Sequence, residues 1–382
     1  MFVIARNGRR SLIFKLNSIR NFSNNTEKTS YYHYESDPGP KFIEPSTQRI
    51  LKSLTCPSVE KVFRKKSSQN SIEYQFMTTE KLEKKFEEMS ALADKYLQMP
   101  PVVMVKNNAP KIISNDPALK NFSENTHIFT DITFGLKQSE RKVVIRHVDG
   151  TLENASMEVQ KRMNQLYFPL KGRKLYCPKM LQEPHFQRCL DEFKYEFVLD
   201  RLCIQYEPYE KEYHDLTSTL YMHVNENKKF HDLRSTRHFG PMAFFFAWHK
   251  IIDDMLYDMI KKEYLRNGVE LIALMNDLHN IEYDKKILDR IEKSPKQFGI
   301  VEELKKSLNS TPDDIHEEIR NAIGKSREDF EIDDFCLNFI ENFVKSKALK
   351  RIPLELAIQT FKETNDEKRR LYEGLRKAHG IN

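Results

Sequence analysis

The 382-residue sequence predicts a predominantly α-helical α+β protein, with a small antiparallel β meander in its middle, a helical C-terminal half and an extended N-terminal arm. Three observations predict this class. Apolar residues recur every three or four positions through most of the second half, which is the period of an amphipathic helix. Between residues 127 and 155 they alternate instead, as in strands. Only eleven glycines occur, which argues against a turn-rich all-β fold.

The first 22 residues contain five basic side chains and no acidic one. This mixture of Arg, Ser and apolar residues is typical of a mitochondrial transit peptide, whereas a secretory signal needs a continuous apolar block. The stretch 20–23 (Arg-Asn-Phe-Ser) resembles a matrix processing site that would make Ser23 the mature N-terminus. A disordered basic tail is the alternative. We predict a transit peptide at 1–22 and a location in the mitochondrial matrix.

Residues 23–70 are polar and predict an extended arm with short helices near 46–55 and 58–66. The first long helix is expected at about 79–98, because apolar side chains recur there at intervals of three and four. Thr79 is expected to cap its N-terminus, and Pro100-Pro101 is expected to end it.

The predicted meander begins at residue 128, and its alternating positions are Ile128, Thr130, Ile132 and Phe134. Residues 142–148 are rich in β-branched side chains and predict a second strand. Asp149-Gly150 predicts a two-residue hairpin turn into a third. Ser156 is then expected to begin a helix that runs to about Leu166. These elements form a predicted α+β domain at 71–180.

The remaining residues, 181–382, predict a helical domain. One apolar stripe consists of Phe186, Leu190, Phe193 and Phe197. A second consists of Phe245, Trp248, Ile252, Met255 and Met259, with a solvated face of Lys250, Asp254, Asp258 and Lys262 on its other side. Ser294-Pro295 and Thr311-Pro312 are expected to begin two further helices. The longest apolar run, at 242–248, has seven residues, far fewer than the roughly 20 of a membrane helix.

The formal charge of +6 is distributed unevenly along the chain. Residues 135–180 contain ten Lys or Arg and four acids, whereas residues 251–343 contain 13 Lys or Arg and 22 acids. From residue 344 onward there are ten basic and five acidic residues. This segmentation suggests one face for RNA and another for proteins. An unevenly charged solvated surface is the alternative.

Several fragments resemble catalytic or metal motifs but have the wrong spacing. Gly324-Lys325-Ser326 lacks the earlier glycine of a phosphate-binding loop, and the helix motif that starts at His316 has Arg320 in place of its second histidine. Asp253-Asp254 and Asp258 are interpreted as a solvated helix face. The five cysteines form no Cys-x-x-Cys pair and are interpreted mainly as small core residues. We predict no catalytic, metal or cofactor site.

Two basic segments, 171–174 and 228–240, combine cations with hydroxyl or aromatic side chains, as backbone-phosphate contact requires. Simple surface solvation is the alternative. Together with the basic residues at 141–146 they supply our candidates for RNA contact. These candidates are Arg141, Lys142, Arg146, Lys171, Arg173, Lys174, Arg234 and Arg237.

A series of short segments resembles the mitochondria-specific ribosomal protein twenty-two family of the small subunit. The resemblance depends on their number and order, and it is concentrated between residues 97 and 260. The segments are Leu97–Val102, Ile128–Ile132, Asp149–Leu152, Arg162-Met163, Tyr167–Pro169, Gly172–Lys174, Leu233–Gly240 and Glu355–Phe361.

The resemblance implies a non-enzymatic structural constituent of the mitochondrial small ribosomal subunit. Its expected partners are small-subunit ribosomal proteins and the small-subunit rRNA, with no membrane, cofactor or small-molecule substrate. Two alternatives come from other classes. One is a matrix RNA-binding assembly factor or regulator that visits the ribosome, and the other is a matrix enzyme whose site is assembled from distant residues.

Overall fold

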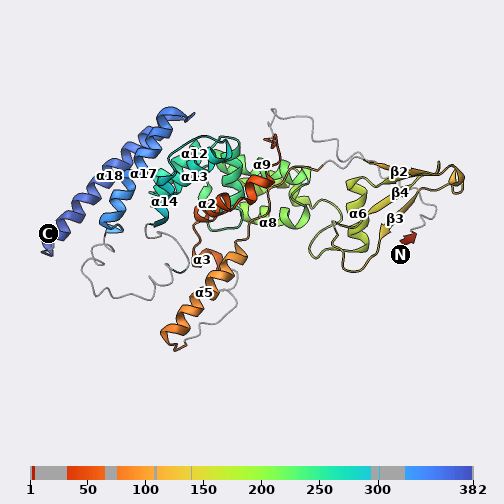
Figure 1. Cartoon of the computed structure of the whole chain (residues 1–382), viewed down its shortest axis with the longest axis horizontal. Coiled ribbons are helices and arrows are strands. Elements are labelled where there is room, and N and C mark those ends of the chain that lie inside the picture. The colour runs from red at the N-terminus through yellow and green to blue at the C-terminus, as the bar shows by residue number, and fades with distance from the viewer. Residues whose placement is uncertain are drawn as a thin grey trace. The chain divides into compact units, whose positions relative to one another are not determined.

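The computed structural model describes residues 2–4, 32–64, 75–106, 110–138, 140–293, 301 and 323–380 (Figure 1). The fold is α+β, as predicted: helices dominate and one antiparallel sheet lies in the middle of the chain. The described residues form two compact units that alternate along the sequence. We call them the sheet unit (within 1–33, 105–194 and 200–216) and the helical unit (34–104, 195–199 and 217–380). The domain boundaries given above remain predictions.

The sheet unit contains a five-stranded antiparallel sheet of order β1-β3-β4-β5-β2. The strands are β1 (Phe2–Ile4), β2 (Ile112–Asn115), β3 (His127–Asp131), β4 (Val143–Arg146) and β5 (Thr151–Asn154). The predicted meander is confirmed as β3, β4 and β5. Strands β1 and β2 were not predicted, and all four residues of β2 are exposed, so it has no alternating pattern. Ile132 and Phe134 lie beyond the end of β3, contrary to prediction, and Phe134 is fully exposed.

The turn between β4 and β5 lies where it was predicted but contains three residues, Val148, Asp149 and Gly150, rather than two. Arg146 pairs with Leu152, and the N–H of His147 donates to the carbonyl of Thr151. Gly150 has φ +90°. A three-residue hairpin loop commonly ends with a residue in this left-handed region, which glycine adopts without strain.

We expect Gly150→Ala to lower the free energy of unfolding by about 1–3 kcal/mol. A Cβ atom here would be strained at positive φ and would also overlap the backbone oxygen of Asp116, which follows β2. Denaturant unfolding of the full chain measures the loss. Gly135→Ala is the matched control, because Gly135 has φ +85° with no atom within 4 Å of its Cβ position. Equal losses for the two variants would contradict a role for the overlap.

Helix α6 (Met157–Tyr167) follows the sheet and packs against β4, with Ser156 at the predicted N-cap position. The stripe predicted from Phe186 to Phe197 is wrong in its second half. Helix α7 (His185–Asp191) buries Phe186 and Leu190, but Phe193 then adopts a positive φ and is exposed, as is Phe197. The turn resets the helical phase, and α8 (Tyr195–Gln205) buries other residues. These are Tyr195, Val198, Leu199 and Leu202.

The N-terminal part of the helical unit contains α1 (Gly39–Ile43), α2 (Pro45–Thr55), α3 (Val59–Val62) and α5 (Thr79–Tyr96). The short helix at 46–55 and the long one at 79–98 are therefore confirmed, although Thr78 rather than Thr79 occupies the N-cap position. Helix α9 (Lys211–Glu226) and α10 (Phe230–Leu233) precede the core.

The core of the helical unit surrounds α11 (Phe239–Trp248) and α13 (Leu265–Leu278). Helix α11 is apolar on every side and packs against both α2 and α13, as expected for a helix with no solvated face. The predicted stripe from Phe245 to Met259 is divided between α11 and α12 (Asp253–Lys261), because Lys250 adopts a positive φ between them. The remaining helices are α14 (Lys286–Lys293), α17 (Arg327–Ser346) and α18 (Arg351–Ala378). The predicted caps at Ser294 and Thr311 lie outside the described residues.

The solvated face predicted around Asp254 is wrong, because Asp253 and Asp254 are only 6% and 7% exposed. The Asp253 carboxylate accepts hydrogen bonds from the backbone N–H groups of Leu349 (2.8 Å) and Lys350 (2.7 Å). It thus lies at the N-terminus of α18, where the helix dipole favours negative charge. Asp254 pairs with the Lys350 side chain at 2.6 Å.

Basic residues from the chain after residue 343 repeatedly pair with acids of the 251–343 segment. Helix α18 runs alongside α17 and contacts α12 (Figure 1). Besides Lys350–Asp254, the ion pairs that attach α18 are Lys362–Glu341, Lys368–Glu263 and Arg369–Asp334. Part of the charge segmentation seen in the sequence is therefore neutralised within the helical unit.

Candidate nucleic-acid interface

Six of the eight predicted RNA-contact residues belong to the sheet unit, at 141–146 and in the loop after α6. The other two, Arg234 and Arg237, belong to the helical unit. The structure therefore divides the candidates into two sets.

Arg141 is buried, with 6% of its surface exposed. Its guanidinium donates to the backbone carbonyls of Asp131 (2.9 Å), Thr133 (3.0 Å) and Leu136 (3.1 Å) and lies 3.6 Å from the ring centre of Phe168. Three carbonyls and a stacked ring hold the guanidinium inside the sheet unit, away from the surface. Arg141 therefore holds the β3–β4 loop, and the RNA contact predicted for it is not supported.

The same loop is attached to α6 by amide side chains. Gln160 donates to the Arg141 carbonyl at 2.7 Å, and the buried Asn164 donates to the Gln138 carbonyl at 2.8 Å. Gln138 in turn donates to the carbonyl of Phe168 at 3.0 Å. Because these bonds are partly shielded from water, they help to fix the β3–β4 loop in one conformation.

Arg173 connects that loop to the segment after α6. Its guanidinium donates to Gln138 Oε1 (3.2 Å), the carbonyl of Ile204 (3.1 Å) and the carboxylate of Glu207 (2.7 Å). Its side chain is only 13% exposed. Arg173 therefore positions the 171–174 loop, and its charge is already paired.

The remaining predicted cations of the two loops are exposed and have no charged partner in the described chain. They are Lys142, Lys171 and Lys174. Exposed aromatic side chains lie in the same two loop regions: Phe134 in the first, and Tyr176, 67% exposed, just after the second. Lysines beside exposed rings on a fixed backbone are the combination used for backbone and base contact with single-stranded nucleic acid. Sequence reasoning missed Phe134 as a contact residue, because its alternating position assigned it to a strand.

Arg146 lies on the sheet itself, half-buried. Its guanidinium is 5.5 Å from the ring centre of Phe129, and His127 lies beside the same ring at 6.5 Å. Strand pairing brings these residues together, since His127 opposes Arg146 in the β3–β4 register. Strands β3 and β4 thus present one cation, Arg146, beside the rings of Phe129 and His127, as the loops present lysines and exposed rings.

In the helical unit, Arg237 is half-buried with its Nε 3.4 Å from the ring of His238. Arg234 is only 7% exposed and stacks on Tyr264. An arginine this deeply buried cannot reach a phosphate on the surface, so the RNA contact predicted for Arg234 is not supported either.

Other chemistry is limited in the described ranges. They contain no group of three or more His, Cys, Asp or Glu side chains able to hold a metal ion, and no helix long and apolar enough to cross a membrane. None of the five cysteines forms a disulfide in the described ranges, and Cys56 and Cys336 are buried. The Lys325 of the apparent phosphate-loop fragment is buried and pairs with Asp333 at 2.8 Å. Ser326 caps α17.

Comparison with known proteins identifies the family. A family model described as mitochondrial 28S ribosomal protein S22 matches residues 40–280. Over 241 residues the chain is 32% identical to the small ribosomal subunit protein mS22 of mouse (Mus musculus) and 31% identical to that of cattle (Bos taurus). Each alignment covers 63% of this chain and 67% of the relative.

The family match includes all eight predicted RNA-contact residues and every resembling segment except Glu355–Phe361. It also spans the sheet of strands β2 to β5 and the core helices α2, α11 and α13. The resemblance inferred from the sequence is thus confirmed. The chain belongs to the family of the mitochondrial small-subunit ribosomal protein S22.

Proposed function

We propose that this protein is a structural constituent of the mitochondrial small ribosomal subunit and supports its assembly, and thereby translation, in the matrix. The observation that carries the proposal is the family match over residues 40–280. The basic, acid-free stretch at 1–22 agrees with import into mitochondria. Membership of a ribosomal protein family supports a structural role rather than an enzymatic one.

Sedimentation of a gently lysed mitochondrial extract tests this function, with the protein quantified in every gradient fraction. We expect it to migrate with the small subunit and with the whole ribosome, near one copy each and resistant to high salt. A peak only with immature subunits would identify an assembly factor instead. Migration as a free protein near its own 45.4 kDa would overturn the ribosomal role.

We propose further that the sheet unit contacts small-subunit rRNA through Lys142, Lys171 and Lys174, and through Arg146 on strand β4. These lysines are supported as contacts by their exposure and by the absence of a paired acid among the residues that the structure describes. Arg173 would act by positioning the loop. Arg237, which lies in the other unit, remains a separate candidate. Neighbouring ribosomal proteins are the remaining partners, because a chain with 62 basic and 56 acidic residues is not bound by RNA charge alone.

We expect the triple change of Lys142, Lys171 and Lys174 to glutamine to weaken binding to a small-subunit rRNA transcript. Each phosphate contact releases counterions, so the slope of log affinity against log salt should become shallower by about two to three. Titrations at several salt concentrations measure this. Glutamine at the exposed Lys81, Lys84 and Lys95 of α5 is the matched control, with no expected change of slope. Equal slopes for the two triple variants would contradict the assignment.

A further inference from the structure

The two loop regions that carry the exposed lysines of the sheet unit also hold two aromatic rings in solvent. Phe134, in the β3–β4 loop, is fully exposed, and Tyr176, just after the 171–174 loop, is 67% exposed. Single exposed apolar side chains are common on protein surfaces. Here, however, the backbone on both sides of each ring is fixed by hydrogen bonds.

The turn that contains Phe134 is closed around the guanidinium of Arg141. That guanidinium donates to the carbonyls of Thr133 (3.0 Å) and Leu136 (3.1 Å), one before the ring and one after it. The Asp131 carboxylate also holds Thr133, because it accepts hydrogen bonds from the backbone N–H (2.9 Å) and the hydroxyl group (2.6 Å) of that residue. Since Arg141 is buried, the turn is anchored from inside the sheet unit while the ring stays in solvent.

Tyr176 is held in the same manner by side chains of neighbouring segments. Gln205 of α8 accepts a hydrogen bond from the backbone N–H of Lys174 (3.0 Å) and donates one to the carbonyl of that lysine (2.9 Å). On the other side of the ring, Gln182 donates to the carbonyl of Cys177 at 3.0 Å. Both rings are therefore in place before a ligand arrives, which reduces the conformational entropy lost on binding.

The same fixed segments carry cations. Lys171 and Lys174 in one loop, and Lys142 at the end of the other, are exposed and have no acidic partner among the described residues. Arg173 joins the two loops, since it donates to Gln138 Oε1 at 3.2 Å. Connected and rigid segments thus present aromatic faces together with ammonium groups whose charge is available to a ligand.

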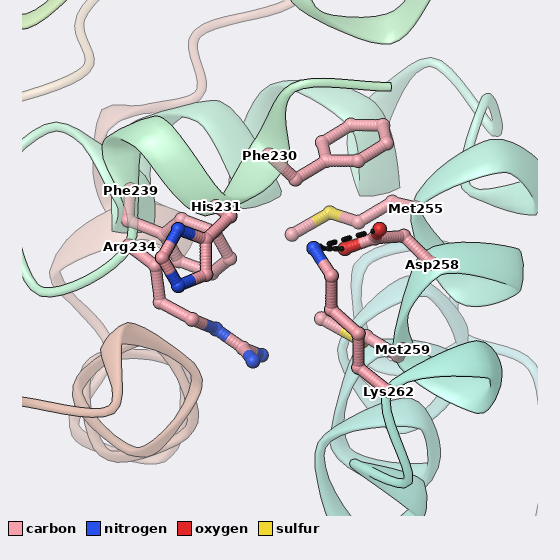
Figure 2. Close-up of a pocket in the computed structure, with 8 residues that line it drawn as sticks. All are labelled: Phe230, His231, Arg234, Phe239, Met255, Asp258, Met259 and Lys262. Carbon is pink, nitrogen blue, oxygen red and sulfur yellow. Dashed lines mark hydrogen bonds and ion pairs between the residues drawn. The ribbon is translucent and has the colours of Figure 1, made fainter.

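The basic segment at 228–240 does not have this arrangement. In Figure 2, Arg234 lies beside Phe239, and Lys262 is joined to Asp258, with 2.9 Å between the charged groups. The space that these side chains line has no room for a water molecule. An RNA base therefore cannot enter there, whereas the two exposed rings of the sheet unit are accessible.

We propose that the sheet unit binds unpaired nucleotides of RNA, whose bases stack on Phe134 and Tyr176 while the three lysines contact the phosphates. Stacking on a protein ring requires a base that is free of its neighbours, and bases inside an A-form duplex stack on one another instead. An apolar pocket of another protein could also accept a ring, but it would leave the adjacent ammonium groups without a counter-charge. The inference rests on the proposed function, because it specifies the form of rRNA that the lysines contact.

The test changes Phe134 and Tyr176 together to leucine in the full chain, which keeps an apolar side chain and removes the aromatic face. The probes are a short RNA of mixed sequence without self-complementarity and the duplex that it forms with its complementary strand. We expect the wild type to bind the single strand more tightly than the duplex. The leucine variant should bind the single strand at least about tenfold more weakly than the wild type. Its salt slope should stay the same, because no cation is lost.

Two controls separate stacking from other effects. Phe134→Tyr combined with Tyr176→Phe keeps both rings and should bind RNA like the wild type. Phe76→Leu removes a fully exposed ring of the helical unit and should leave the affinity unchanged. The unfolding temperature of the double leucine variant should equal that of the wild type, because both rings are exposed. A tenfold loss of affinity in either control would contradict the proposal.

Three further results would overturn the stacking in distinct ways. Equal affinity of the wild type for single strand and duplex would show contact with phosphates alone. Unchanged RNA binding by the leucine variant, with reduced incorporation into the small subunit, would show that the rings dock into a protein. Unchanged RNA binding with unchanged incorporation would show that the rings have no partner. Failure of the lysine triple variant to change the salt slope would instead remove the proposed rRNA contact itself.

Discussion

Replacing Lys325 with methionine is expected to lower the free energy of unfolding by about 3–5 kcal/mol, because the change leaves a buried carboxylate without its counter-charge. Lys325 is 5% exposed and precedes α17. Its ammonium group lies 2.8 Å from the carboxylate of Asp333, 3.0 Å from the side-chain oxygen of Asn365 and 3.4 Å from Glu263. These partners lie on or next to three different helices, so Lys325 connects α17, α18 and the chain after α12.

Asp333 is the group that suffers most from the loss. It is 2% exposed, and burial already raises its pKa even though Lys325 lowers it. Without the lysine, the carboxylate must either remain charged in an apolar environment or bind a proton. Either outcome raises the free energy of the folded state. The unfolded chain is not affected in this way, because there the carboxylate is hydrated.

A second variant separates the charge from the packing. In Lys325→Met with Asp333→Leu, both charged groups are replaced by apolar ones, and we expect most of the lost stability to return. Denaturant unfolding measures both variants. Arg327→Met is the control on the same helix, because its pair with Glu331 is exposed and 3.8 Å apart, and it should change stability by less than about 0.5 kcal/mol. An equal loss in the single and double variants would show that Lys325 acts through packing instead.

Lys325 also illustrates what the sequence could not indicate. The local pattern Gly324-Lys325-Ser326 suggested only an incomplete phosphate loop. Its true role depends on Asp333 and Asn365, which are 8 and 40 residues away, and no local period connects such positions. Asp253 is similar: its acceptor role depends on N–H groups 96 and 97 residues later.

The elements that were predicted correctly have a strong local signal. Helix α5 follows from its apolar spacing, and β3, β4 and β5 follow from alternation and from the Asp149-Gly150 turn. The failures are also local in origin. An exposed strand such as β2 has no buried face and hence no alternation. Single residues in the left-handed region, Phe193 and Lys250, interrupted the two predicted helical stripes, and after Phe193 the buried face is made of other residues.

For the candidate site, composition located the basic loops but could not rank the cations within them. Arg141 and Lys142 are neighbours in sequence, yet one is buried under three carbonyls and the other is exposed. Which of the two side chains is buried depends on the path of the β3–β4 loop. That path is set by the hydrogen bonds from Gln160 and Asn164 of α6. The composition of the segment around Arg234 predicts a surface loop, but the four residues from Leu233 to Thr236 are all buried.

A second buried charge, Glu270 on α13, makes the stability of the helical unit depend on pH. Glu270 is 8% exposed, and burial raises its pKa to about 7. Hydrogen bonds from Ser53 (2.6 Å) and Asn267 (3.3 Å) oppose that rise, and the charge of Glu292 adds to it. Since Ser53 belongs to α2, the carboxyl group lies in the contact between α2 and α13.

The direction of the effect follows from the two pKa values. The folded state holds the proton of Glu270 more tightly than the unfolded state, whose pKa is near 4.5. The stabilisation is therefore fully present below pH 4.5 and is lost as the pH rises toward 7. A shift of this size corresponds to about 3 kcal/mol. Above pH 7 the ionised carboxylate remains buried, and this contribution to stability is absent.

Glu270→Gln should remove this dependence, because the amide has nearly the same shape and does not ionise. We expect the variant to match the wild type near pH 5 and to exceed it by about 2 kcal/mol at pH 8, after about 1 kcal/mol is deducted for one altered hydrogen bond. Denaturant unfolding at pH 5, 6, 7 and 8 measures the difference, which isolates Glu270 from other titrating groups. Glu331→Gln, at an exposed position of α17, should follow the wild-type curve at every pH. If the Glu270→Gln curve also ran parallel to that of the wild type, the carboxyl group of Glu270 would be charged throughout this range, and its burial would be balanced by Ser53 and Asn267.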